Sequence, residues 1–200
     1  MDNEEEYLNL DSSENVTPGP SSQEVTFDGP RLTFTLLVMI IPFYIFGDRL
    51  FHFIWVHRAP VISLVIPMWI KAVSIVLAIV VHELIHGIVF ALYAPHGFRS
   101  VTFGFNAKIG AFYCHCKEPI RVKHYRRAGI APLIILGLIP LVIGFITGVG
   151  WFKTFGLLLT IGGFGDLLVY IKLLKLGKNR FLLDHPDKLG FILDPPSSIQ

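Results

Sequence analysis

The sequence predicts an all-α membrane protein with four transmembrane helices and a small β-hairpin on its cytosolic side. Hydrophobic residues make up 52% of the 200 residues and charged residues only 16%, which is typical of a multi-pass membrane protein. Acidic residues are sparse in the long central region, where residues 29–183 contain only Asp48, Glu83, Glu118 and Asp166. Each of these acids therefore needs a chemical explanation.

Both ends of the chain are predicted to lie outside the helical region. Residues 1–30 are polar, rich in Asp, Glu and Ser, and contain Pro18-Gly19-Pro20, so a disordered acidic tail is expected. Residues 178–200 contain Asp184-His185-Pro186 and are expected to form an irregular cytosolic tail. The intervening residues 31–177 then form one multi-pass transmembrane domain.

Four apolar runs in this domain are long enough to cross a bilayer. The second run is too long for a simple crossing, and Pro67 and Lys71 suggest that its first part lies at the membrane interface. Two prolines in the third run, Pro132 and Pro140, predict kinks. The four runs cover about residues 32–55, 61–94, 128–149 and 152–174.

Basic residues distinguish the two sides of the membrane. The loop between the second and third runs and the tail after the fourth hold many lysines and arginines, whereas the opposite side has only Arg49, Arg58, Lys71 and Lys153. By the positive-inside tendency the basic side is cytosolic. We therefore expect a multi-pass protein of the cell membrane with both termini in the cytosol, and an ion pair between Asp48 and Arg49 at the far interface.

The β-hairpin is predicted over residues 101–116, which alternate and are rich in aromatic and β-branched side chains. Asn106-Ala107-Lys108 is a plausible turn. At the hairpin's end, Cys114-His115-Cys116 resembles a metal clamp, but alternation sends the two cysteines to one face and His115 to the other. We favour ordinary strand residues here.

His82-Glu83-Leu84-Ile85-His86 is the strongest chemical signal in the chain. Two histidines four residues apart lie on one helical face and can share a zinc ion, with Glu83 beside them to handle a proton. The motif lies in the apolar run from Ile75 to Tyr93, which has no other charged residue. Because ionisable groups are costly in lipid, this setting favours a functional zinc site over a chance match.

A catalytic zinc usually has three protein ligands, and Asp166 is the candidate for the third. It is the only acid in the fourth run. His86 and Asp166 each lie nine residues before the predicted cytosolic exit of their helix, so their depths should match at roughly 13 Å. Asp166 could instead cap a kink or hydrogen-bond the edge of a histidine ring.

These residues also carry a family resemblance. His82 to Gly87 in one span, with Gly163-Phe164-Gly165-Asp166 in a later one, resembles the membrane-embedded zincins of the site-2 protease type. The chain is most similar to a bacterial and archaeal family described as "putative zincin peptidase", over roughly residues 60–195. The resemblance implies a core of three helices around zinc with the first span peripheral, His82, His86 and Asp166 as ligands, and Glu83 as catalytic base.

One departure from the site-2 protease pattern is visible. Those enzymes usually carry an Asp-Gly pair, preceded by Asn and Pro, in the later span. Here Gly165 precedes Asp166 and Leu167 follows it. The contacts on the oxyanion side of the site are therefore not inherited from the resemblance.

The sequence thus predicts an intramembrane zinc metalloprotease that cleaves membrane-embedded or membrane-adjacent polypeptides near the cytosolic face. Its expected partners are the lipid bilayer and a polypeptide substrate, with no nucleic acid; the oligomeric state is not predicted. One alternative is a metal or proton transporter in which His82, Glu83, His86 and Asp166 form a relay. A second is a non-catalytic membrane adaptor of the same fold.

Overall fold

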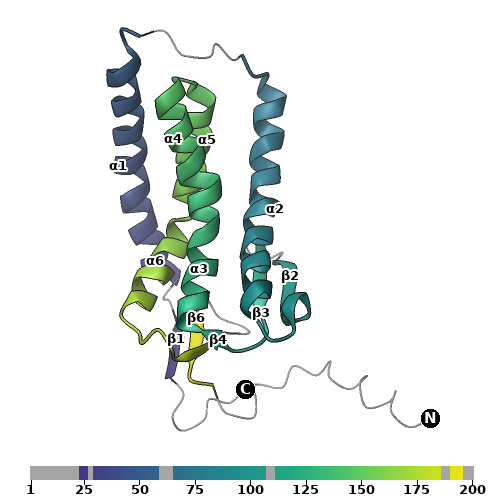
Figure 1. Cartoon of the computed structure of the whole chain (residues 1–200). Helices are drawn as coiled ribbons and strands as arrows, with labels where there is room; N and C mark the ends of the chain where they lie inside the picture. Colours follow the sequence, from purple (N-terminus) through teal and green to yellow (C-terminus); the bar gives the residue numbers. More distant parts are fainter. Residues whose placement is uncertain (1–22, 27–28, 59–64, 107–110, 186–189, 196–200) are drawn as a thin grey trace, which may run out of the picture.

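The computed structural model describes residues 23–26, 29–58, 65–106, 111–185 and 190–195. Long helices form a bundle, and small antiparallel sheets lie at one end of it (Figure 1). We call this the sheet end. The opposite end, where the chain turns between two neighbouring helices, is called the hairpin end. This name refers to the helical turn and not to the β-hairpin, which lies at the sheet end.

Three helical segments are long and apolar enough to cross a membrane. The first two are α1 (Gly29–Trp55) and α2 (Met68–Tyr93). The third is continuous from α3 (Val122–Pro132) through the π-helical segment Leu133–Leu138 to α4 (Ile139–Thr147). It begins six residues before the predicted start at residue 128, so the basic Tyr125-Arg126-Arg127 stretch is helical rather than part of a loop.

The fourth predicted span is a broken one. Helix α5 (Gly150–Gly162) and helix α6 (Phe164–Leu174) are bent by 51° at Gly163, and together they pass the same length and composition test. The count is four if this bent pair is one span and three otherwise.

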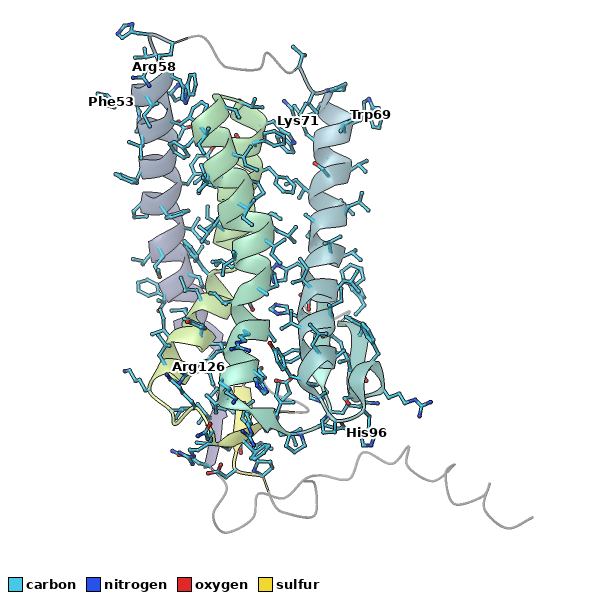
Figure 2. All side chains as sticks on the ribbon, in the orientation of Figure 1. Phe53, Arg58, Trp69, Lys71, His96 and Arg126 are labelled. Carbon is cyan, nitrogen blue, oxygen red and sulfur yellow. The ribbon has the colours of Figure 1, made fainter. Side chains whose placement is uncertain are left out.

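The outer faces of the helices are apolar. Between 11% and 22% of the residues in the three apolar windows are buried, so most of their side chains face outward, as lipid contact requires. Arg58, Trp69 and Lys71 lie at the hairpin end, and His96 and Arg126 at the sheet end (Figure 2). Basic and aromatic side chains therefore mark both ends of the apolar belt.

Small residues allow α4 and α5 to pack closely. A Cβ atom on Gly144 would lie 2.3 Å from the backbone nitrogen of Lys153, and one on Gly156 would lie 2.3 Å from that of Leu141. Gly148 ends α4 in the left-handed conformation, with φ of 74°, which glycine adopts without strain. The two helices therefore form a tight antiparallel pair that leads the chain back toward the sheet end.

The predicted hairpin is present. Strand β2 (Val101–Asn106) pairs with β3 (Ala111–Cys116) in antiparallel register, with Phe103 opposite Cys114. The predicted turn lies partly in residues 107–110, which are outside the described residues.

A second sheet corrects the all-α prediction. Its strand order is β1 (Gln23–Thr26), β6 (Gly190–Leu193), β5 (Phe181–Asp184) and β4 (Ile120–Arg121), all antiparallel. The protein is mostly helical with small antiparallel sheets. Part of the tail expected to be irregular is therefore β-strand, and so are residues 23–26 of the expected disordered tail.

Burial of apolar side chains explains why these short strands form. Leu182, Phe191 and Leu193 lie against Val122 and Leu173 in one buried cluster. Covering the ends of α3 and α6 at the sheet end with apolar strands removes these side chains from water. The sheet therefore fixes the ends of two helices that lead to the candidate site.

Candidate metal centre

Helix α2 presents its two histidines on one face, as the motif predicts. His82 and His86 are one turn apart, and their Nε2 atoms lie 3.2 Å from each other. The helix runs without a proline from Met68 to Tyr93, so its 3.6-residue period is uninterrupted at the motif.

Asp166 meets both histidines from another helix. It lies in the first turn of α6, just after the bend at Gly163. Its Oδ2 atom is 3.0 Å from His82 Nε2 and 3.5 Å from His86 Nε2. The structure therefore brings together the three residues that the sequence predicted as ligands.

The three donor atoms fit a zinc ion. Ligand atoms about 2.0 to 2.1 Å from a tetrahedral zinc lie about 3.3 Å from one another. The three separations here are 3.0, 3.2 and 3.5 Å. Among the described residues, His82, His86 and Asp166 are the group of His, Cys, Asp and Glu side chains with this clustering. The triangle has the size of one face of a zinc coordination tetrahedron.

The orientation of His86 is fixed by a backbone group. Its Nδ1 lies 2.9 Å from the carbonyl oxygen of Ala128 in α3, and the ring is buried. With Nδ1–H donating to that carbonyl, Nε2 keeps its lone pair and points toward His82 and Asp166. Metal-binding histidines are commonly held by such a bond. Sequence analysis could not identify Ala128, because it contributes a main-chain carbonyl, a group that every residue has.

Glu83 lies beside this cluster and is partly buried. The backbone N–H of Cys114 in β3 is within hydrogen-bonding range of its carboxylate. Within the described residues, no lysine or arginine forms an ion pair with Glu83 or Asp166. The site thus combines two carboxylates with two imidazoles, and no described residue supplies it with a permanent cation.

The hairpin packs directly on the motif. A Cβ atom on Gly87 would lie 2.2 Å from the Phe103 ring, so the glycine after His86 gives β2 room to approach α2. Burial raises the pKa of the Cys116 thiol to about 11 and that of Cys114 above its usual range. Neither cysteine belongs to the cluster of donor atoms formed by His82, His86 and Asp166, which supports the interpretation of both as strand residues.

Asp184 is a residue that the sequence analysis missed. From β5 its Oδ2 accepts a hydrogen bond of 2.8 Å from the backbone N–H of Cys116, and its Oδ1 accepts one from the Tyr125 hydroxyl. Tyr125 packs against Phe90, with ring centres 5.1 Å apart, and Phe90 stacks on His86. Asp184 therefore connects the C-terminal sheet to the surroundings of the metal centre.

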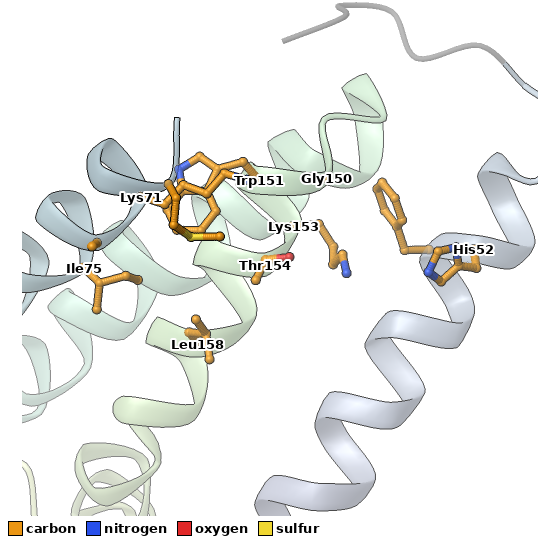
Figure 3. A pocket seen from close by; sticks show the side chains of 11 residues that line it. His52, Lys71, Ile75, Gly150, Trp151, Lys153, Thr154 and Leu158 are labelled. Atoms are coloured by element: carbon orange, nitrogen blue, oxygen red, sulfur yellow. The ribbon is translucent and has the colours of Figure 1, made fainter. Parts of the chain in front are cut away.

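The hairpin end holds a different charged group. Lys153 Nζ in α5 donates a 2.7 Å hydrogen bond to Asp48 Oδ1 in α1. The predicted pairing of Asp48 with its neighbour Arg49 is therefore wrong, because the buried lysine is the group that needs a counter-ion. A cavity of about 570 Å³ lies beside this pair, between α1, α2 and α5 (Figure 3). Its walls include Phe51, Lys71 and Trp151.

Comparison with known proteins identifies one family. A family model described as "putative zincin peptidase" matches residues 75–181, which is more than half of the chain and includes all four predicted site residues. Neither the curated proteins nor the solved structures give a match.

Proposed function

The chain belongs to the family described as "putative zincin peptidase", and on that premise we propose that it is an intramembrane zinc endopeptidase. Membership itself indicates a metallopeptidase-like activity and zinc as the metal. The proposal adds that cleavage takes place within the helical bundle, near a cytosolic sheet end. The substrates would be membrane-embedded or membrane-adjacent polypeptides.

One observation carries the proposal. Three donor atoms from two apolar helices form a triangle of 3.0 to 3.5 Å, and a carboxylate that is not one of the three lies next to it. In this proposal His82, His86 and Asp166 hold the zinc, and Glu83 is the catalytic base. The Ala128 carbonyl positions His86 by fixing its tautomer.

Bound zinc would lower the pKa of a coordinated water toward about 7 and polarise the scissile carbonyl. Glu83 accepts the proton of the attacking water and later delivers it to the leaving amine.

Strand β3 is suited to hold the substrate extended. The backbone N–H groups of Cys114 and Cys116 point away from β2, toward Glu83 and Asp184. The outer edge of β3 therefore runs past the proposed base, and a substrate would pair with it by displacing the carboxylates that now accept from these N–H groups. A helical substrate hides its peptide bonds in its own hydrogen bonds, and pairing with a strand edge would hold an unwound segment open.

The test is hydrolysis of an unfolded, dye-quenched casein, which has no helix to unwind. Purified protein with zinc should cleave it, and Glu83→Gln should lower the rate by about 10² to 10⁴-fold with unchanged zinc content. Glu118→Gln is the matched control, because Glu118 pairs with His96 away from the cluster.

The result also separates the alternatives. A rate that is unchanged in Glu83→Gln contradicts the proposed catalytic role of this residue. A metal or proton transporter, or a non-catalytic adaptor, would give no cleavage that depends on both zinc and Glu83.

A further inference from the structure

A basic cavity lies at the sheet end, between α3, α6 and the segment that follows α6. Its volume is about 320 Å³. Four of the six residues that line it are lysine or arginine, and none is acidic. They are Lys123, Arg126, Arg127, Ile130, Tyr170 and Lys178.

The positive charge of this cavity is not neutralised by acidic side chains. Within the described residues, neither Lys123 nor Lys178 takes part in a salt bridge, and Arg127 donates to the Tyr93 hydroxyl at 2.9 Å. Arg126 donates to the carbonyl oxygens of Leu173 and Leu176 at the end of α6. Four cations in a small volume without a carboxylate constitute a site for an anion.

The backbone holds the two lysines in place. The N–H of Lys123 donates a 3.2 Å hydrogen bond to the carbonyl of Lys178, which brings the first turn of α3 next to the chain after α6. The cavity is therefore built from segments that are far apart in sequence and fixed by main-chain contacts. It is more than a run of basic residues on one helix.

The cavity is lined by other residues than those of the metal centre, although Tyr170 follows Asp166 by one turn of α6 and Arg127 also reaches Tyr93 of α2. Lys123, Arg126, Arg127 and Ile130 follow the spacing of one helical face. Ala128, whose carbonyl binds His86, belongs to the face turned toward α2. An anion held by the lining residues would therefore be bound by side chains other than the proposed zinc ligands.

Along the bundle, the cavity lies at the level expected for phospholipid headgroups. The third candidate span begins at Val122 and the bent pair ends at Leu174, so the cations lie where two apolar segments leave the apolar belt. Arg126 marks this level in Figure 2. Ile130 lies about 12 Å further along α3 than the first residue of that helix. A cationic rim above an apolar wall matches a phosphate with attached acyl chains.

We propose that this cavity binds the phosphate of an anionic phospholipid. Lys123 and Lys178 pair with the phosphate oxygens, the Tyr170 hydroxyl donates to the headgroup, and an acyl chain follows the surface near Ile130. The bound lipid would bridge α3 to α6, the helices that carry Ala128 and Asp166. The inference rests on the bilayer location in the proposed function, but it does not require that the protein cleave a peptide.

Native mass spectrometry of the detergent-purified protein tests this with phosphatidylglycerol and phosphatidylcholine as probes. Phosphatidylglycerol should remain bound preferentially. Lys123→Gln/Lys178→Gln should weaken its binding about 30-fold, and Lys178→Gln alone, at an exposed position, about 5-fold. Arg99→Gln/Lys117→Gln is the control, because it removes the same charge from exposed positions at the same end but outside the cavity.

Three outcomes overturn the inference. Equal binding of the two lipids removes the role of headgroup charge, and equal loss in the control variant removes the role of this cavity. Displacement of the lipid by millimolar inorganic phosphate would indicate a soluble anion as the ligand. A chain that stays soluble without detergent would instead contradict the bilayer location, and so would also count against the proposed function.

Discussion

The two ends of the bundle differ in the groups that are paired with their carboxylates. At the hairpin end, Asp48 lies among apolar helices with Lys153 at 2.7 Å as its counter-ion. At the sheet end, Glu83 and Asp166 lie near two histidines, and no lysine or arginine in the described part of the chain forms an ion pair with them. The carboxylate at the hairpin end is paired with a permanent cation, whereas within the described residues the two carboxylates of the metal centre are not.

This difference bears on metal binding. A buried charge is costly unless it is paired, and a histidine pairs with a carboxylate as a cation only when it is protonated. Because His86 donates Nδ1–H to Ala128, its free Nε2 can bind a metal without gaining a proton. A zinc ion would supply at the sheet end the positive charge that Lys153 supplies at the hairpin end.

The largest predicted effect is the loss of zinc-dependent stability in His86→Ala. The wild type should contain zinc, and zinc at about 1,000 times its dissociation constant should raise the free energy of unfolding by about 4 kcal/mol. His86→Ala should give no such increase, since it removes one of the three proposed zinc ligands. His96→Ala is the control, because His96 pairs with Glu118 outside the cluster.

Zinc content and thermal unfolding in detergent, with and without added zinc, measure this effect. An equal zinc response in the wild type and His86→Ala would contradict the proposal that zinc bound by His86 supplies the positive charge at the sheet end. Asp166→Asn then tests the third corner: unchanged zinc content would leave Asp166 as a hydrogen-bond partner of His82 only.

The next effect concerns the hairpin end. Asp48→Met should lower the free energy of unfolding by about 3 kcal/mol, because it leaves the buried Lys153 without its counter-ion. Asp48→Met/Lys153→Met removes both charges and should recover most of this loss. Unfolding in detergent of the two single variants and the double variant gives the coupling energy. A double variant no more stable than Asp48→Met would show that the pair is not what stabilises this end.

Local periodicity explains what the sequence predicted correctly. A regular helix places His82 and His86 on one face, and the scarcity of acids in the later spans singled out Asp166. The hairpin at 101–116 follows from alternation in the same way. The bend at Gly163, which lets α6 direct Asp166 toward α2, has only its glycines as a local signal.

What the sequence did not predict depends on partners that are distant along the chain. Residues 181–184 and 190–193 are short apolar runs, and they form strands because β1 and β4 pair with them and α3 covers them. The Tyr125-Arg126-Arg127 stretch is helical partly because Arg126 reaches the carbonyls that end α6. Such contacts cannot be recognised from the composition of a local window.

A smaller effect tests how the C-terminal sheet supports the metal centre. Asp184→Ala should lower the free energy of unfolding by about 2 kcal/mol, since it leaves the buried Cys116 N–H and the Tyr125 hydroxyl without their acceptor. Asp194→Asn is the control, because it disturbs only an exposed pair with Arg180.

The effect of Asp184→Ala should depend on pH. Burial raises the pKa of Asp184 above 3.8, so the folded state binds its proton more tightly than the unfolded state does. Wild-type stability from this group is therefore greatest below pH 3.8 and falls as the pH rises toward the raised pKa. Since alanine does not titrate, the difference between wild type and variant should shrink over that range. A difference that grows with pH would contradict the burial of this carboxyl.

The smallest effect distinguishes the two cysteines from the donor triangle. Burial raises the pKa of Cys116 from 9.0 to about 11, which at neutral pH reduces the thiolate about 100-fold. Alkylation of Cys114→Ala, which leaves Cys116 as the single thiol, should therefore be at least that much slower than that of an exposed cysteine. Zinc should not change the rate, because the thiol is not among the three donors. Fast alkylation that zinc suppresses would assign Cys116 to the metal and would require a different ligand set at this end of the bundle.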